Sequence, residues 1–206
     1  MGNWIMNRVL PKLDSKQFGA IRGRFTTHAL LICYIMWHKA LDQSQLASAM
    51  FVEFAKAFDP VDHTVVISNL IELAIPGLVV KWFASFLSGR QQRVKIANNL
   101  SSWLILKGGM PRGSWLEPFT LIIVIDKLKL SRSTHKYIDD TTLTKILFPG
   151  QTSQMVGCMN ELHQWSLADI MQINKQKTKE MVVTTSRTAS LFHSSRILNG
   201  LKLSNC

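Results

Sequence analysis

The chain has 206 residues, which fits one domain or two small ones, and apolar residues make up 47% of it, enough for a packed core. Its 24 Lys and Arg residues against 13 Asp and Glu residues give a formal charge of +11, which favours a polyanionic partner, nucleic acid first and an anionic membrane second. Three widely spaced cysteines, with no Cys/His cluster at zinc-ligand spacing, exclude a disulfide framework and a structural zinc site.

Targeting and membrane segments are not expected in this sequence. The first ten residues are too short and too interrupted for a signal peptide. The longest apolar run, residues 119–125, is far shorter than a bilayer-spanning helix. We therefore expect an intracellular protein, nuclear or cytoplasmic, without membrane insertion.

The N-terminal region combines a helical pattern with a basic, glycine-containing stretch. Apolar residues recur at roughly helical spacing over residues 2–13, where Pro11 interrupts the pattern. Residues 17–24 follow with two glycines and with Arg22 and Arg24. Glycine lets the backbone approach a ligand, and arginine binds phosphate with a forked donor. The stretch predicts either a phosphate-binding loop or a plain basic surface loop.

Residues 26–41 predict a helix, and residues 47–54 predict an extended, mostly apolar strand. A carboxylate inside such a strand, here Glu53, is costly unless it is paired, solvated or bound to a metal ion. The strand therefore points to a cation near Glu53. The apolar residues expected to form the buried face of the helix are Leu30, Leu31, Tyr34, Ile35 and Trp37.

The middle of the chain predicts two helices followed by a hairpin. Asp62 can cap a helix over residues 65–73, and residues 79–87 predict a second helix. Residues 91–96 and 103–106 predict the two strands of a hairpin with a basic edge.

The next stretch is a glycine-containing loop, residues 108–113, whose backbone is free to approach a ligand. A largely apolar helix is expected over residues 115–130, and another over residues 153–170. Residues 181–185 predict a strand.

Tyr137-Ile138-Asp139-Asp140 predicts a tight hairpin, because extended-favouring residues surround a two-residue turn signal. The tip would present two carboxylates beside a sheet, and paired carboxylates suit a hard divalent cation such as Mg²⁺. The alternative for this segment taken alone is a solvated Asp-Asp turn.

Three motifs stand in a fixed order along the chain: residues 51–59 (FVEFAKAFD), 108–118 (GGMPRGSWLEP) and 137–140 (YIDD). With this order, residues 17–179 resemble the reverse transcriptase domain of a non-LTR (LINE-like) retroelement. The resemblance implies an α/β (α+β) fold, namely the right-hand palm of a polymerase with an antiparallel sheet, helices, partial fingers and no thumb. It implies a single domain, with a fingers remnant at about 1–45, the palm at about 46–185 and a frayed tail at 186–206.

The same resemblance implies RNA-directed DNA synthesis on an RNA template and a DNA primer, with Mg²⁺ as cofactor and Mn²⁺ as the alternative. The implied catalytic residues are Glu53, Asp139, Asp140 and Lys177. The implied metal ligands are Glu53, Asp139, Asp140 and the backbone carbonyl of Phe54. The implied contacts to the deoxynucleotide triphosphate are Arg22, Arg24, Phe58, Arg112 and Gly113, with core packing as the alternative role of Phe58.

Three departures from the family pattern predict impaired synthesis. Glu53 replaces an Asp, Arg112 replaces a Gln, and Glu117 replaces a Gly. The extra carbon in Glu53 moves the carboxylate by ~1.5 Å, and a misplacement of about 1 Å can lower the rate roughly a hundredfold. Two alternatives stay open: a non-catalytic, basic nucleic-acid-binding relic of the same fold, and an unrelated basic α/β protein.

Overall fold

The computed structural model describes residues 2–111, 113–130, 133–148, 151, 155–168, 171–185, 197–198, 201–202 and 204–205. The helices are α1 (Gly2–Val9), the 3-10 helix η1 (Leu10–Lys12), α2 (Thr26–Asp42), α3 (His63–Glu72), α4 (Gly77–Leu87), α5 (Leu116–Asp126) and α6 (Met155–Ala168). The strands are β1 (Leu46–Val52), β2 (Gln91–Gln92), β3 (Lys95–Ile96), β4 (Asn99–Leu100), β5 (Leu104–Ile105), β6 (Ser133–Tyr137), β7 (Asp140–Leu147), β8 (Lys179–Val183), β9 (Ile197–Leu198), β10 (Leu201–Lys202) and β11 (Ser204–Asn205). Most of the tail predicted at 186–206 lies outside the described residues.

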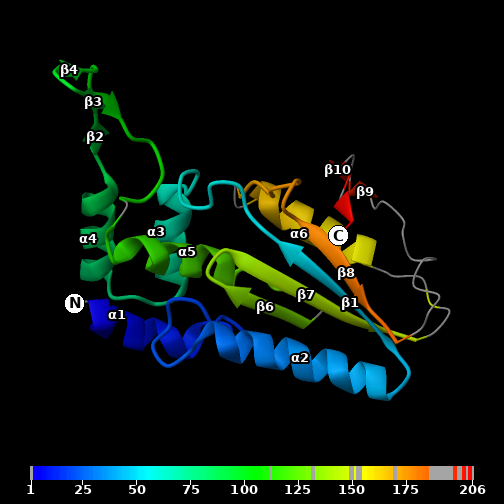
Figure 1. The fold of residues 1–206 in the computed structure, drawn as a ribbon. Coiled ribbons are helices and arrows are strands. Elements are labelled where there is room, and N and C mark those ends of the chain that lie inside the picture. The colour runs from blue at the N-terminus through cyan, green and yellow to red at the C-terminus, as the bar shows by residue number, and fades with distance from the viewer. Residues whose placement is uncertain are drawn as a thin grey trace.

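A five-stranded sheet of order β11-β8-β1-β7-β6 organises the molecule, and Figure 1 shows its strands β8, β1, β7 and β6. All its neighbouring strands are antiparallel except β11 and β8. The register of β1 on β7 runs from Leu46↔Leu147 to Val52↔Thr141. The residue after β1, Glu53, therefore arrives beside the first residue of β7, Asp140.

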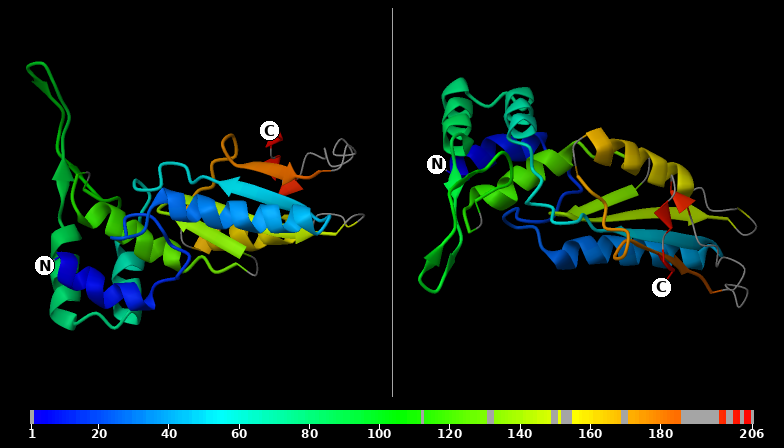
Figure 2. Two further views of the ribbon diagram at one scale, coloured as in Figure 1. Left: turned by 60° about the horizontal axis from the view of Figure 1, so that its bottom comes forward. Right: turned by 90° about the horizontal axis from the view of Figure 1, so that it is seen from above.

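Helices lie on both faces of the sheet, with α6 on one side and α2 on the other (Figure 2). Met50 and Val52 of β1 are buried in the same apolar cluster as the inner face of α6 and nearly all of α5. Phe54 extends this packing, since its ring meets the ring of Trp165 edge-on with centroids 5.6 Å apart. This helix-backed antiparallel sheet confirms the predicted palm architecture.

The expected buried face of α2 was wrong. Leu30, Leu31, Tyr34 and Ile35 are each more than half exposed, whereas Cys33 and Ala40 are the residues buried in this helix. The physical reason is that apolar residues surround α2 almost completely, so periodicity did not say which stripe would face the sheet. The stripe that packs is the one with small side chains, which lets α2 approach the sheet closely.

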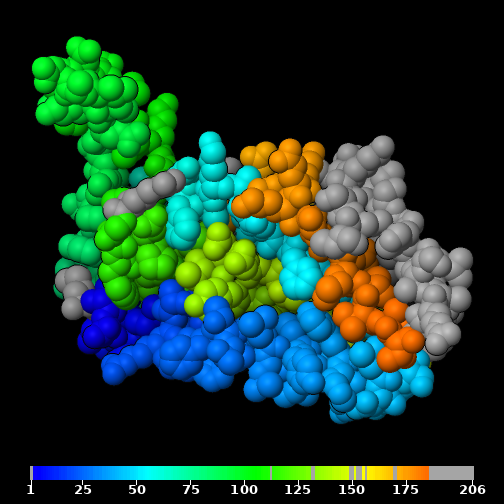
Figure 3. Space-filling view, in the orientation of Figure 1, coloured from blue at the N-terminus to red at the C-terminus, as the bar shows by residue number. Residues whose placement is uncertain are grey.

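The other predicted helices and strands are confirmed, with ends that move by a few residues. Asp62 caps α3 as expected, because its Oδ1 accepts a hydrogen bond from Thr64 N at 2.7 Å. The hairpin formed by strands β2 to β5 stands clear of the body as an arm (Figure 3). In the described part of the chain, no helix is long and apolar enough to cross a membrane.

Candidate active site

The Asp139–Asp140 hairpin forms at the joint of β6 and β7, but its turn begins one residue earlier than predicted, because Asp140 is already the first residue of β7. Tyr137 pairs with Asp140, so Ile138 and Asp139 make a two-residue turn. Ile138 has φ +56°, a left-handed conformation that branched side chains rarely adopt. The turn is therefore held in an unfavourable backbone geometry, at the position that presents both carboxylates.

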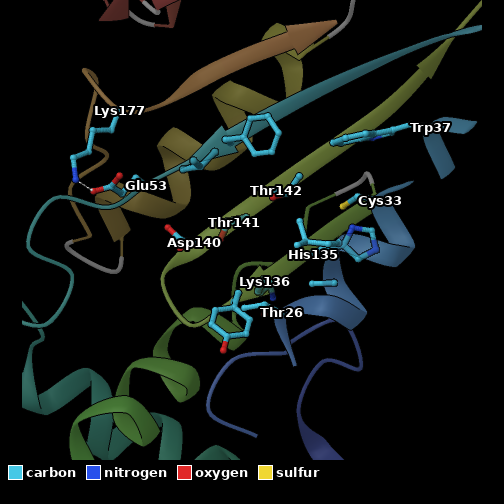
Figure 4. A pocket seen from close by; sticks show the side chains of 15 residues that line it. Thr26, Cys33, Trp37, Glu53, His135, Lys136, Asp140, Thr141, Thr142 and Lys177 are labelled. Atoms are coloured by element: carbon cyan, nitrogen blue, oxygen red, sulfur yellow. Dashed lines mark hydrogen bonds and ion pairs between the residues drawn. The ribbon is translucent and has the colours of Figure 1, made fainter. Parts of the chain in front are cut away.

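Glu53 directly follows β1 and is hydrogen-bonded to the segment that precedes β8. Asn174 N donates to Glu53 O at 2.8 Å, and Glu53 N donates to Thr178 Oγ1 at 3.4 Å. The side chain is paired as well, because Lys177 Nζ lies 2.5 Å from Glu53 Oε1 (Figure 4). Three residues of one short segment thus fix both the backbone and the carboxylate of Glu53.

Burial and nearby charges raise the pKa values of both aspartates. Desolvation raises the pKa of Asp139, and the negative charge of Glu53 raises it further. Desolvation also raises the pKa of Asp140, with further increases from the charges of Asp139 and Glu53. The positive charge of Lys177 lowers the pKa of both aspartates and so opposes these shifts. In turn, the pKa of Lys177 is raised, first by its hydrogen bond to Glu53 and then by the surrounding carboxylates. The site is a small negative cluster in which Lys177 supplies the positive charge.

The donor set fits a hard divalent cation in kind, because carboxylate oxygens are the ligands that Mg²⁺ and Mn²⁺ prefer. Among the described residues, however, no three His, Cys, Asp or Glu side chains lie close enough together to hold one ion. Glu53 instead pairs with Lys177. The expected convergence of the carboxylates of Glu53, Asp139 and Asp140 on one point is therefore met by the strand ends but not by the side chains as they stand. The carbonyl of Phe54 lies one residue beyond Glu53.

A groove of about 320 Å³ opens between α2 and the sheet and ends at Glu53 and Asp140 (Figure 4). Its walls are largely apolar, and Trp37 meets Phe51 edge-on with ring centroids 6.5 Å apart. Cys33 lies on the same wall. The groove gives a flat, apolar ligand surface a place directly beside the carboxylates.

The glycine loop before α5 closes against the segment after Glu53. Gly109 N donates to Val61 O at 2.8 Å, and Met110 N donates to Phe58 O at 3.2 Å. A Cβ at Gly109 would lie 3.0 Å from Asp59 O, and its φ of +78° also favours glycine. Phe58 is half-buried and packs on the core, as its alternative role predicts, while its contact with a nucleotide remains a prediction.

The loop also places a carboxylate at the start of α5. Gly113 N donates to Glu117 Oε2 at 2.9 Å. This backbone N–H, predicted to face a nucleotide, is therefore already paired within the chain. Arg112, predicted as a nucleotide contact, lies outside the described residues.

The two arginines before α2 differ in their surroundings. Arg22 is exposed. Arg24 is half-buried, and its Nη1 donates to the carbonyl oxygens of Ser15 and Gln17 at 2.9 and 2.5 Å. Arg22 is thus free to meet a phosphate, whereas Arg24 already holds the backbone before it.

Sequence reasoning missed the roles of Asn174 and Thr178. Asn174 Oδ1 accepts hydrogen bonds from Gln176 N and Lys177 N, which makes a tight turn that returns Lys177 to Glu53. Thr178 is fully buried behind that turn. The Asn-x-x-Lys-Thr spacing carried the signal, because an Asn two residues before its backbone partner is typical of such turns.

An antiparallel sheet backed by helices, with one acidic residue after the end of β1 and two where β7 begins, is the arrangement of the palm in nucleotide polymerases. Residues 3–195 match the family described as Reverse transcriptase (RNA-dependent DNA polymerase). The chain belongs to this family.

One curated relative is the "Probable RNA-directed DNA polymerase from transposon BS" of Drosophila melanogaster, 27% identical over 194 residues. The match covers 83% of this chain and 20% of that protein, so the chain spans about a fifth of the relative's length.

Solved structures of telomerase share the fold. Telomerase from Candida albicans, in complex with a fragment of telomeric RNA, has a TM-score of 0.67 at 14% identity. The match covers 98% of this chain and 36% of the telomerase chain. Telomerase from Candida tropicalis, also with a telomeric RNA fragment, has a TM-score of 0.66 at 10% identity. The match covers 89% of this chain and 33% of the telomerase chain. At these identities the likeness shows the fold alone.

Proposed function

We propose that this chain is the palm and part of the fingers of an RNA-directed DNA polymerase from a non-LTR transposon, and that its nucleotidyl transfer is impaired. The observation that carries the proposal is the arrival of Glu53, at the end of β1, beside the Asp139–Asp140 turn. In this proposal residues 1–45 belong to the fingers, 46–185 to the palm and 186–206 to a tail.

In the proposed reaction Glu53, Asp139, Asp140 and the carbonyl of Phe54 would hold Mg²⁺, or Mn²⁺ in its place, once Glu53 has released Lys177. Such ions would supply activation of the primer hydroxyl and stabilisation of the leaving oxygen. Lys177 has an exposed ammonium group with a raised pKa, so it stays protonated and can pair with the pyrophosphate as it leaves.

The nucleotide and nucleic-acid contacts follow from the surroundings of the carboxylates. Arg22 is exposed for a phosphate, and the backbone of Phe58 is hydrogen-bonded to the glycine loop through Met110 N. Arg24, Arg112 and Gly113 complete the proposed deoxynucleotide site. An RNA template and a DNA primer fit the charge of +11, which attracts phosphate backbones.

Two features of the site support the proposed impairment. Binding a metal ion requires Glu53 to exchange Lys177 for the ion, and this exchange weakens metal affinity because an existing 2.5 Å ion pair must open. Glu117 adds a carboxylate at Gly113 N, where a triphosphate would otherwise accept the hydrogen bond.

Primer extension on an RNA template with Mg²⁺ tests the proposal. We expect weak synthesis by the chain, none by Asp139→Ala, and a gain of about tenfold to a hundredfold by Glu53→Asp, which restores the shorter carboxylate. Glu161→Asp on α6 makes the same chemical change away from the site and should leave the rate unchanged. Vigorous synthesis by the unaltered chain would contradict the impairment.

The second candidate is a non-catalytic nucleic-acid-binding relic of the same fold. It is favoured by the lack, among the described residues, of three ligands close enough to hold an ion. Its signature is salt-sensitive binding of an RNA–DNA hybrid without synthesis by Glu53→Asp in either Mg²⁺ or Mn²⁺.

A further inference from the structure

The segment before α2 closes over the turn of the Asp139–Asp140 hairpin. Lys136 N donates to Lys16 O at 2.9 Å, and Phe18 N donates to Lys136 O at 2.8 Å, so Gln17 forms a parallel bridge along the outer edge of β6. We name residues 14–24 the strap. The strap thereby reaches the strand that carries the turn.

Gln17 extends from the strap to the turn itself. Its side chain is completely buried, and its Oε1 accepts hydrogen bonds from Ile138 N at 3.1 Å and from Gly19 N at 3.0 Å. Two N–H donors fix the orientation of this amide, because the reversed amide would set its NH₂ group against both of them. Gln17 Nε2 is buried without a hydrogen-bond partner in the described part of the chain. The contacts of Oε1 therefore determine where this side chain lies.

Gly19 holds the other side of the turn. A Cβ at this position would lie 2.3 Å from Ile138 N and 2.5 Å from Ile138 Cγ1, so only glycine permits the approach. Ile138 itself has φ +56°, which a branched residue keeps only when its surroundings impose it. Gln17 and Gly19 both contact Ile138 at its backbone N–H, and its side chain also packs against the apolar core.

The strap is anchored at both ends. Near its start, the buried Lys136 Nζ lies 3.1 Å from Asp14 Oδ2, and Asp14 N donates to Asp126 Oδ1 at 2.6 Å. Near its end, Ile21 is buried in the main apolar cluster, and Arg24 Nη1 closes the strap on itself by donating to the carbonyl oxygens of Ser15 and Gln17. A strap fixed at both ends can constrain the turn that it touches.

We propose that Gln17 and Gly19 are positioning residues: they hold Ile138 in its left-handed conformation and so set where Asp139 and Asp140 stand relative to Glu53. The proposal rests on the proposed function only in taking these carboxylates as the functional ones. The local part, that the strap holds the turn, is tested without activity.

Native-state amide hydrogen exchange measured by NMR is the first test. Gln17→Leu removes the acceptor at similar volume, and we expect the Ile138 amide to exchange about tenfold faster, which corresponds to about 1.4 kcal/mol. Gln17→Glu keeps an acceptor oxygen and should restore the rate to within about twofold. The amide of Ala49, in the centre of β1, should exchange alike in all these proteins.

Asn69→Leu is the matched control, because it replaces a buried amide on α3 whose side-chain atoms have no partner among the described residues. It should leave the Ile138 amide unchanged. An unchanged Ile138 amide in Gln17→Leu would overturn the proposal. So would equal acceleration at Ile138 and Ala49, which would indicate loss of overall stability.

The second test is a titration with Mn²⁺. Its binding is measured by the paramagnetic broadening of the NMR signals of Asp139 and Asp140. We expect Gln17→Leu and Gly19→Ala to weaken Mn²⁺ binding about threefold to tenfold, with Gln17→Glu close to the unaltered chain. Unchanged affinity in both weakening variants would overturn the positioning role. If the unaltered chain binds no Mn²⁺, the proposed function fails, while the exchange rates still decide whether the strap holds the turn.

Discussion

The carboxyl groups of Asp139 and Asp140 are harder to ionise in the folded chain than in the unfolded one. Desolvation raises the pKa of each above the ordinary value of 3.8, and neighbouring negative charges add to the effect. A raised folded-state pKa contributes stability that is present below the unfolded pKa and is lost as pH rises through the folded pKa. At neutral pH this site therefore lowers the stability of the fold that carries it.

Asp139→Asn should raise the melting temperature at pH 7, because the amide has the same shape without the charge. We expect an increase of about 2 °C, the size of a modest change in a domain of this length. The gain should shrink as the pH falls through the raised pKa of the folded chain and vanish well below the ordinary value of 3.8, where Asp139 is protonated in both states. Thermal unfolding followed by circular dichroism at several pH values measures both effects.

Asp62→Asn is the opposite control on the same chain. Hydrogen bonds from Thr64 lower the pKa of Asp62, so its ionised form contributes stability above the unfolded pKa, and this contribution is lost as pH falls. The variant should gain no stability at pH 7. Equal gains at both positions would show that the effect of Asp139→Asn does not come from its site.

At the residue scale the sequence predicted the acidic positions but not their pairing. The motif order predicts Glu53, Asp139 and Asp140 as site residues, and the register of β1 on β7 places the backbone of Glu53 beside that of Asp140. The pairing of Glu53 with Lys177 depends on the turn made by Asn174, which acts through contacts across the sheet. Sequence patterns along one segment hold no information about which side chain of another segment it will meet.

Glu117, at the start of α5, affects both the helix and the glycine loop before it. Glu117 lies in the first turn, where a negative charge is favoured by the helix dipole, and its Oε2 accepts from Gly113 N. In the sequence, Glu117 departs from the glycine of the family pattern, and this departure predicts harm to a nucleotide site. The structure adds that the same residue stabilises the loop, so the two effects should oppose each other.

Glu117→Gly should lower stability and strengthen triphosphate binding. We expect a loss of about 1 kcal/mol, because a hydrogen bond and a favourable charge are removed and glycine enters a helix. We expect the affinity for a deoxynucleotide triphosphate to rise severalfold, because Gly113 N becomes free and a repelling charge is gone. Denaturant unfolding and the fluorescence of nearby Trp115 measure the two quantities.

Glu117→Gln separates charge from hydrogen bonding. Its amide oxygen can still accept from Gly113 N, so stability should fall less than in Glu117→Gly. Affinity should rise only by the part due to charge. If neither variant binds triphosphate more tightly, the carboxylate does not obstruct the nucleotide site.

At the element scale, helices and strands were predictable where a pattern had one solution. Asp62 marks the start of α3 as expected, and the Tyr137–Asp140 pair closes the predicted hairpin. The orientation of α2 was not predictable, because apolar residues cover most of its circumference. Its packing was decided by the small side chains of Cys33 and Ala40, which fit against the sheet.

At the scale of the whole molecule, the arm is an exposed, positively charged feature that stands apart from the body (Figure 3). Residues 91–105 are all exposed, and residues 90–107 contain four Lys or Arg residues and no Asp or Glu. Arg93 lies over the ring of Trp103 at 4.4 Å, which holds its charge outward along the ribbon. A two-stranded basic ribbon that extends from the body suits the groove or backbone of a nucleic-acid duplex.

Replacing both Arg93 and Lys95 with alanine should weaken the binding of an RNA–DNA hybrid and lower its salt dependence. Each phosphate contact that is lost removes about one from the slope of log affinity against log salt, so the slope should fall by about two. The matched control replaces Lys12 and Lys127, which changes the net charge equally. These two side chains already bind Leu73 O and Glu72 within the body. If both double variants change the slope alike, attraction comes from the total charge of +11, and the arm has no particular share in it.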